Sequence, residues 1–279
     1  MMLGLLWASA FPLAKIATHG LPVFTIVAIR LVTAAALLMA IRAAVTGKWL
    51  SYPPGSLWPM TVLACIGNNI PFVLLTLGLT TLKSGEAALL IALAPLFGML
   101  MAAAVLSDEP LSRKRIAGTL MGFAGAALVI APQLSGKSPH APWWAYACLV
   151  ATAASYGAVH VAAKHYSRYP ALDRATGSMI LSALFSLPPV LFEQPWALPA
   201  FPSSSVFASL ALGVFPSALA GLLFFQLASR HGTLMTGFAG YTVPVFGVLA
   251  GAVFFDEPLT LHVIGAMTLI LLGMVAARK

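Results

Sequence analysis

Charged residues are scarce in this chain. Asp, Glu, Lys and Arg make up only 8% of its 279 residues, whereas a soluble domain carries about 25%. Hydrophobic residues make up 60%. A water-soluble fold of this size cannot cover its surface with so few charges. The composition therefore excludes a cytosolic enzyme, a nucleic-acid-binding protein and a disordered chain, and it predicts an integral membrane protein.

Cysteine is also rare, and common catalytic motifs are absent. The two cysteines, Cys65 and Cys148, both lie inside apolar runs, which favours small buried side chains over a disulfide or a metal pair. The sequence has no Walker-type glycine loop, no His-Glu-x-x-His pattern and no Gly-x-Ser-x-Gly turn. We therefore expect no catalytic residues, no metal site and no cofactor.

Apolar segments, broken by proline, glycine and charge, fill almost the whole chain. Each is close to the roughly 20 residues that a helix needs to cross a bilayer. The expected fold is an all-α integral membrane protein with ten transmembrane helices. The predicted spans are Met2–Ala17, Val23–Thr46, Leu57–Leu79, Gly85–Leu106, Arg113–Ala131, Trp143–Lys164, Asp173–Phe192, Val206–Ala228, Gly232–Phe255 and Leu261–Ala277.

The positive charges divide unequally between the two predicted faces. Three of the fifteen Lys and Arg residues (Lys15, Lys83 and Lys137) fall on one face, and Arg30 falls within a span. The other face collects Arg42, Lys48, Arg113, Lys114, Arg115, Lys164, Arg168, Arg174, Arg230, Arg278 and Lys279. Because Lys and Arg concentrate in cytoplasmic loops, we expect both termini to be cytoplasmic.

The two halves of the sequence resemble each other at an offset of 147 to 149 residues. Residues 1–131 form one predicted five-helix repeat and residues 143–279 the other. An odd number of spans per repeat places the copies in opposite orientations, as in alternating-access transporters. The matching stretches include Lys83–Gly85 with Arg230–Gly232, Pro95–Gly98 with Pro244–Gly247, and Asp108–Leu111 with Asp256–Leu259.

Aromatic residues occupy corresponding positions in the first and sixth predicted spans. Trp7 and Phe11 are four residues apart, as are Tyr156 and His160, so each pair shares one helix face. These faces could hold an apolar ring or a cation in a cavity; lipid-facing aromatics are the alternative. His160 is also a candidate proton carrier, with a packed, hydrogen-bonding histidine as the alternative.

Amide side chains in the third span form a second candidate site. Asn68 and Asn69 precede Pro71, which cannot donate a backbone hydrogen bond and so loosens the helix. The eighth span carries Pro216 at the equivalent place, and breaks at matching places in two halves point to a binding site. Hydrogen bonding between helices is the alternative. Gln226 and Tyr241, which flank the hairpin predicted between the eighth and ninth spans, are further polar candidates for the cavity.

Some conspicuous residues have structural interpretations. Arg30, whose equivalent position in the second copy holds Ser178, is expected to pair with a carboxylate or with backbone carbonyls, and anion binding is the alternative. The Gly-x-x-x-Gly pairs beginning at Gly118 and Gly247 predict close helix packing, within the fold or with another subunit. The Asp-Glu-Pro corner at Asp256–Pro258 is expected to be solvated and to start the next helix.

The duplicated pattern resembles the EamA family of the drug/metabolite transporter superfamily. The similarity includes the Trp-Ala-Ser-Ala-Phe opening followed by Lys15, the Arg30-Leu31 start of a small-residue-rich span, and the Asp-Glu-Pro-Leu corners. It covers essentially the whole chain. Within the family, the sequence looks most like bacterial inner-membrane exporters of aromatic and other amino acids or of cationic compounds such as methyl viologen. The resemblance implies ten helices with a substrate cavity between the halves.

The predicted function is export of amino acids or similar small metabolites across the bacterial inner membrane by alternating access. Export of cationic drugs and passive facilitation of a metabolite are the alternatives. The expected partners are a small-molecule substrate and membrane lipid, without nucleic acid. The oligomeric state stays open, with a monomer among the alternatives.

Overall fold

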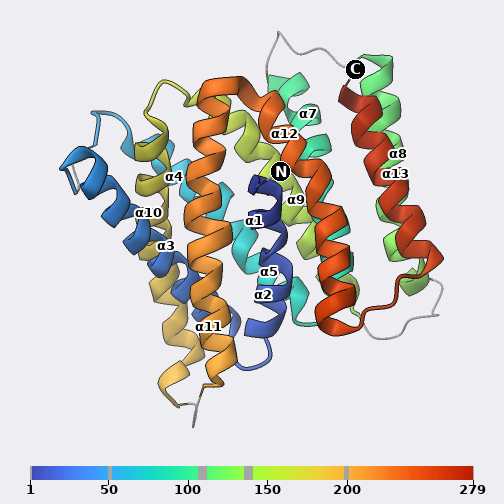
Figure 1. The fold of residues 1–279 in the computed structure, drawn as a ribbon, viewed down its shortest axis with the longest axis horizontal. Helices are drawn as coiled ribbons and strands as arrows, with labels where there is room; N and C mark the ends of the chain where they lie inside the picture. The colour runs from blue at the N-terminus through green and yellow to red at the C-terminus, as the bar shows by residue number, and fades with distance from the viewer. Residues whose placement is uncertain (1, 50–51, 106–111, 135–140, 198–200, 279) are drawn as a thin grey trace.

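The computed structural model describes residues 2–49, 52–105, 112–134, 141–197 and 201–278. Throughout these ranges its regular structure is helical, and it contains no strand (Figure 1). The first half contains α1 (Met2–Ala8), α2 (Ala10–Ala17), α3 (Val23–Thr46), α4 (Leu57–Ala64), η1 (Cys65–Asn69), α5 (Ile70–Leu79), α6 (Ser84–Ile91), α7 (Ala94–Val105) and α8 (Arg113–Leu134). The second half contains α9 (Trp143–His165), α10 (Ala171–Glu193), η2 (Pro195–Ala197), α11 (Ser203–Leu212), η3 (Gly213–Leu219), α12 (Ala220–Phe255) and α13 (Leu261–Arg278).

Seven helical segments in the described ranges are long and apolar enough to cross a bilayer. They coincide, within a few residues, with the second to seventh predicted spans and with the eighth, which extends over Ser203–Arg230. Shorter apolar helices lie where the first, ninth and tenth spans are predicted: Met2–Ala17, Thr242–Phe255 and Leu261–Ala277. The chain is a multi-pass membrane protein.

The structure differs from the prediction in two places, within the first span and between the eighth and ninth spans. The first span divides into α1 and α2 at Ser9, because Pro12 cannot donate to the carbonyl of Ala8. The end of the eighth span and the whole ninth span belong to one helical run, α12, so the loop predicted after Ala228 is absent. Thirty-six residues of straight helix would extend about 54 Å, well beyond a hydrocarbon core of about 30 Å. Figure 1 shows that α12 instead bends into two legs that run in opposite directions.

Wide, π-helical turns interrupt the third and eighth segments. The segment η1 separates α4 from α5 just before Pro71, and η3 contains Pro216 between α11 and α12. The irregularity predicted at these two prolines is therefore present in both halves. A carbonyl released in the first of them, that of Ile66, accepts a hydrogen bond from Ser155 Oγ at 2.6 Å. π-Helical turns within α-helices are frequent at functional sites.

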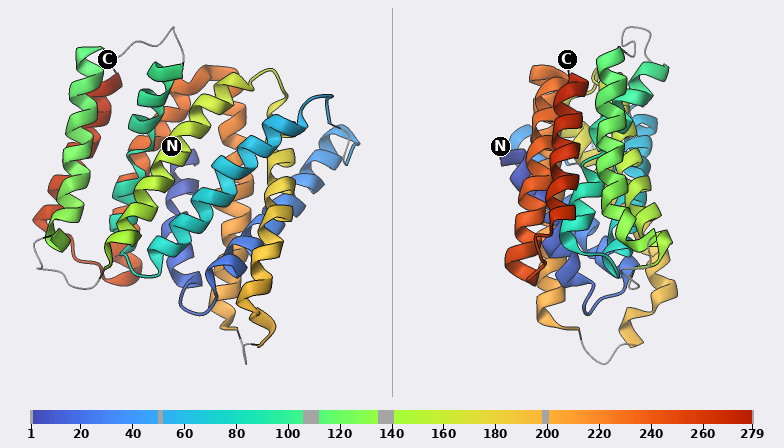
Figure 2. Two further views of the ribbon diagram at one scale, coloured as in Figure 1. Left: turned by 180° about the vertical axis from the view of Figure 1, so that it is seen from behind. Right: turned by 90° about the vertical axis from the view of Figure 1, so that its right-hand side faces the viewer.

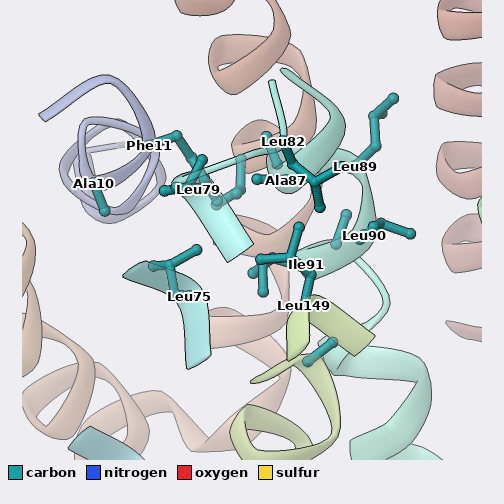
Figure 3. Packing of buried hydrophobic residues seen from close by; sticks show 14 of the residues in the cluster. Ala10, Phe11, Leu75, Leu79, Leu82, Ala87, Leu89, Leu90, Ile91 and Leu149 are labelled. Carbon is teal, nitrogen blue, oxygen red and sulfur yellow. The ribbon is translucent and has the colours of Figure 1, made fainter. Parts of the chain in front are cut away.

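Two groups of buried side chains hold the helices together. The first centres on α6, whose residues 87–91 are all buried and pack against α2, α5, α9 and α12. Figure 3 shows Phe11 from α2, Leu75 from α5 and Leu149 from α9 converging on this helix. The second group joins α3, α10 and the first leg of α12. Cys65 and Cys148 are free thiols, and both are only partly buried.

Glycine allows the closest helix contact, between α8 and α13. These helices lie side by side in both views of Figure 2, and the left view shows them at one end of the molecule. A Cβ atom placed on Gly273 would lie 2.6 Å from the carbonyl oxygen of Gly118 and 2.6 Å from the amide nitrogen of Gly122. Neither backbone can move away without separating the helices. The packing predicted from Gly118 and Gly122 is therefore a contact within the fold.

Glu257 has a different environment from the one predicted. Its two carboxylate oxygens accept hydrogen bonds from the backbone N–H groups of Ser84 at 2.6 Å and Gly85 at 2.8 Å. These N–H groups begin α6 and have no partner within that helix, and the helix dipole favours a negative charge there. Asp256 is exposed as expected, but Glu257 ties the α12–α13 connection to α6.

Candidate functional site

A cavity of about 150 Å³ lies at the centre of the helices. Its walls come from both halves of the sequence, with α1, α2, α3 and η1 on one side of the duplication and α9, η3 and α12 on the other. Engineered apolar cavities of this size bind benzene, so the space suits a small ring or an aliphatic side chain. Most of the lining is apolar. The polar side chains in it are Arg30, Asn68, Tyr156, His160, Ser178 and Ser217.

Aromatic rings form one wall of this cavity. The ring centroids of Trp7 and Phe224 are 5.7 Å apart, and His160 meets Phe224 edge to face at 5.4 Å. Phe225 continues the row, 5.2 Å from Phe224. Aromatic pairs at such distances attract each other beyond their simple burial. The structure thus brings the predicted Trp7 and His160 together from helices far apart in the sequence; we call Trp7, His160, Phe224 and Phe225 the aromatic wall.

Three further predicted residues also line the cavity. Phe11 and Tyr156 belong to the same cavity as the aromatic wall. Asn68 reaches it from η1, where its amide nitrogen donates to Ser182 Oγ at 3.0 Å. That hydroxyl in turn donates to the carbonyl of Ser178 at 2.6 Å. The amide is therefore held by α10 while it contributes to the wall of the cavity.

Two predicted residues, Asn69 and Gln226, are not brought to this cavity. Asn69 Nδ2 donates to the carbonyl of Ser182 at 3.0 Å, and Asn69 lines a separate groove with Phe24 and Phe185. Adjacent helical residues point about 100° apart, and here Asn68 faces the central cavity while Asn69 faces the separate groove. Gln226 is half-buried but is not a lining residue. The side chain of Tyr241 lies outside the described residues.

Phe224, Phe225 and Ser217 were not among the predicted residues, because the candidates were polar side chains at mid-span and aromatic residues of the first and sixth segments. Their spacing in the sequence does indicate a shared helix face. Ser217, Gly221, Phe224 and Phe225 are spaced i, i+4, i+7 and i+8, which places them on one helix face. Gln226 lies on the neighbouring face, which explains why it misses the cavity.

Arg30 has neither of its expected partners. Its Nε donates to Ser217 Oγ at 2.7 Å, and its guanidinium carbon lies 3.4 Å from the ring centroid of Phe72. Its Nη1 is buried without a hydrogen-bond partner among the described residues. No Asp or Glu belongs to the described lining of the cavity. The predicted pairing with a carboxylate or a carbonyl is therefore wrong, because a hydroxyl and an aromatic ring from other helices occupy those positions.

The described part of the chain offers little for metal or acid–base chemistry. It contains no group of three or more His, Cys, Asp or Glu residues that could hold a metal ion. The cavity combines an aromatic wall, an amide, several hydroxyls and one permanent cation. Such a lining can bind a small amphipathic molecule through its apolar part and a few polar contacts.

Comparisons with known proteins place this architecture in a family. The chain is 29% identical over 253 residues to a probable terminal-alkyne amino-acid exporter of Streptantibioticus cattleyicolor, covering 90% of this chain and 82% of that protein. It is 28% identical over 250 residues to the aromatic amino acid exporter YddG of Ancylobacter novellus, covering 88% and 83%. A crystal structure with 24% identity has the same fold, with a TM-score of 0.72 and coverage of 99% of this chain and 93% of that one.

The family assignment rests on most of the chain. The sequence profile of the EamA-like transporter family matches residues 1–131 and again residues 143–278. The two matches together leave out only the connection between them and the last residue. The resemblance inferred from the Trp7 region, Arg30 and the Asp-Glu-Pro corners is thus confirmed. This chain belongs to the EamA-like transporter family.

Proposed function

We propose that this protein exports amino acids, aromatic and other neutral ones, or similar small metabolites across the bacterial inner membrane. Its family and the names of its relatives, which include amino-acid exporters, support a transporter of small molecules rather than an enzyme. The proposed arrangement is ten transmembrane helices in two inverted five-helix repeats, residues 1–131 and 143–279. Both termini would face the cytoplasm, in keeping with the distribution of Lys and Arg.

The observation that carries this proposal is the cavity between the two halves. Its aromatic wall offers a surface for an apolar side chain, and Asn68, Tyr156 and Arg30 offer polar contacts to the rest of the molecule. The proposed substrate-binding residues are therefore Trp7, Phe11, Asn68, Tyr156 and His160. Asn69 and Gln226 remain sequence-based candidates whose role would require another conformation. Tyr241, whose side chain lies outside the described residues, also remains a sequence-based candidate.

The same lining weighs against export of cationic drugs. A cation in this cavity would meet the guanidinium of Arg30 and no carboxylate among the described lining residues. Cation–π contact with the aromatic wall would be its main attraction. A passive facilitator would need a continuous polar path through the molecule, whereas the polar groups here are separate points in an apolar lining.

The wide turns η1 and η3 supply a physical basis for alternating access. Each interrupts a membrane-crossing helix beside the cavity, one in each half. Helices bend most readily where the regular hydrogen-bond ladder is broken. Exchange of conformation between the two halves around these points would open the cavity to one side of the membrane and then to the other.

Flux measurements in proteoliposomes test the proposal. Vesicles containing the purified full-length protein are loaded with unlabelled amino acid, and uptake of the labelled amino acid from a panel of neutral and aromatic species is followed by counterflow. Saturable exchange of at least one amino acid above protein-free vesicles is expected. Exchange of methyl viologen, without exchange of any amino acid, would instead favour the cationic alternative.

A further inference from the structure

Among the described residues, the guanidinium of Arg30 has a hydrogen-bond partner at Nε and an aromatic ring against one face. Its Nε donates to Ser217 Oγ at 2.7 Å, and that hydroxyl donates its own proton to the carbonyl of Leu212 at 2.7 Å. The serine oxygen therefore acts as a fixed acceptor that holds the guanidinium in place. The face of the group rests on Phe72. Nη1, one of its forked donor groups, has no partner among the described residues.

The positive charge of Arg30 is also not neutralised by the described protein around it. The side chain is 2% exposed, and arginine stays protonated in proteins. Tyr156 and His160 are the other ionisable groups in the described lining of the cavity, and neither supplies a carboxylate. A buried charge without an opposite charge is unfavourable. A serine hydroxyl and a phenyl face reduce this cost but leave the net charge unchanged.

Ser217 is set in place by the same irregular turn that breaks the helix. The hydrogen bond from Ser217 Oγ to Leu212 spans five residues, in the wide geometry of η3. A guanidinium clamped in this way presents its remaining N–H groups in a planar fork, which matches the two oxygens of a carboxylate. Its place in the cavity lining makes that fork part of the same site as the aromatic wall.

We propose that Arg30 is the subsite for the carboxylate of the transported molecule, while the aromatic wall takes its apolar part. This inference rests on the proposed function, because it takes the central cavity as the substrate site. It narrows the substrate class to small amphipathic carboxylates. Amino acids belong to that class, and so do analogues that keep the carboxylate but lack the amino group; amines and amides without a carboxylate do not.

Matched ligand pairs test the subsite on the unaltered protein. The pairs are L-phenylalanine with L-phenylalanine amide, and 3-phenylpropionate with 3-phenylpropionamide, titrated into the purified full-length protein in detergent by calorimetry. Each pair differs at the carboxylate alone. We expect both acids to bind about 10- to 100-fold more tightly than their amides, the factor associated with a hydrogen bond to a charged group. Equal affinity within the pairs, or no binding of either acid, would overturn the proposal.

Variants assign this preference to Arg30. Arg30→Gln is expected to lose the difference between 3-phenylpropionate and its amide, and Arg30→Lys to keep part of it, because an ammonium keeps the charge without the planar fork. Lys48→Gln is the matched control, since it removes an exposed charge outside the cavity. A difference that survives in Arg30→Gln would overturn the assignment. If that variant does not fold, the partial loss in Arg30→Lys decides the question.

The two proposals fail in different ways. If no amino acid is exchanged in proteoliposomes but 3-phenylpropionate binds in a manner that depends on Arg30, the export of amino acids is wrong and the carboxylate subsite stands. If amino acids are exchanged while acid and amide bind equally, the subsite is wrong and the export function stands.

Discussion

The guanidinium of Arg42 donates to the carboxylate of Asp173, with 2.9 Å between Nε and Oδ1. This ion pair joins the end of α3 to the beginning of α10. At the opposite ends of the same helices, Glu193 accepts hydrogen bonds from the backbone and the hydroxyl of Thr25, at 2.7 and 2.9 Å. The antiparallel pair α3 and α10, whose ends both face water at the bilayer surfaces in the proposed topology, is therefore fastened by a carboxylate at each end.

Removing the charge of Asp173 should weaken this pair of helices. The side chains of Arg42 and Asp173 are only 3% and 13% exposed, so Asp173→Asn leaves a buried guanidinium without its ionic partner. The expected loss of stability is about 3 kcal/mol, seen as a lower midpoint of thermal unfolding in detergent. Asp256→Asn is the control, because Asp256 is exposed and asparagine tolerates its left-handed backbone. A similar midpoint for both variants would contradict the role given to Asp173.

A single methyl group should distinguish two glycines of α13. In Gly273→Ala the new Cβ would lie 2.6 Å from backbone atoms of α8, whereas in Gly265→Ala the nearest atom is a leucine methyl at 3.9 Å. Overpacking predicts a loss of roughly 1–3 kcal/mol for the first variant. The second should be neutral or slightly more stable, since alanine favours a helix over glycine. Unfolding midpoints of the two purified variants provide the measurement, and equal midpoints would exclude a tight α8–α13 contact.

Loss of the indole of Trp7 should impair substrate binding. Trp7 lines the cavity and packs on Phe224, while Trp143, at the start of α9, is 76% exposed. Trp7→Ala is expected to raise the KM for counterflow of an aromatic amino acid about tenfold. Trp143→Ala should leave KM unchanged, even if less of the variant protein is present in the membrane. Unchanged KM in Trp7→Ala would remove the aromatic wall from the substrate site.

His160 offers a test of proton coupling. His160 contacts Phe224 inside the cavity, and we expect its ring to serve packing. His160→Gln should lower exchange about two- to tenfold, because it removes one aromatic contact. The factor should be the same with and without an imposed pH gradient. The exposed His165 on the same helix supplies the control variant His165→Gln. If His160→Gln abolishes only the stimulation by the gradient, His160 carries a proton.

Much of the fold is predictable because membrane insertion imposes a length on each apolar segment. The boundaries of Val23–Thr46 and Leu57–Leu79 follow directly from the prolines, glycines and charges around them. The prolines at 71 and 216 also indicate where the helices lose regularity. The continuous path of α12 was not predictable, because Arg230 and Gly232 resemble a loop in composition, and only tertiary packing decides whether the backbone there stays helical.

The site was predictable in composition and less so in detail. Polar and ionisable residues at mid-span are expensive in lipid, and this cost identifies Asn68 and His160 from the sequence. Trp7 was identified by its spacing from Phe11, which places the two rings on one helix face. The partners of Arg30 could not be found in this way, since Ser217 is 187 residues further along the chain. Ser217 and Thr61 both donate to a carbonyl earlier in their own helical segment, and no local pattern shows that the oxygen of Ser217 also accepts from a guanidinium.

The wide turn η1 also sets the angular register of the third membrane segment. In an unbroken α-helix, Leu63 and Leu75 would be rotated by about 120° from each other, so both could not face one cavity. A π-helical turn accommodates one additional residue, which reduces this angle to about 20°, and both leucines do line the cavity. Deleting a single residue between Cys65 and Asn69 would turn Phe72 and Leu75 away from the cavity while the length of the segment hardly changes. The phase of this helix, more than its hydrophobicity, therefore determines what the cavity can recognise.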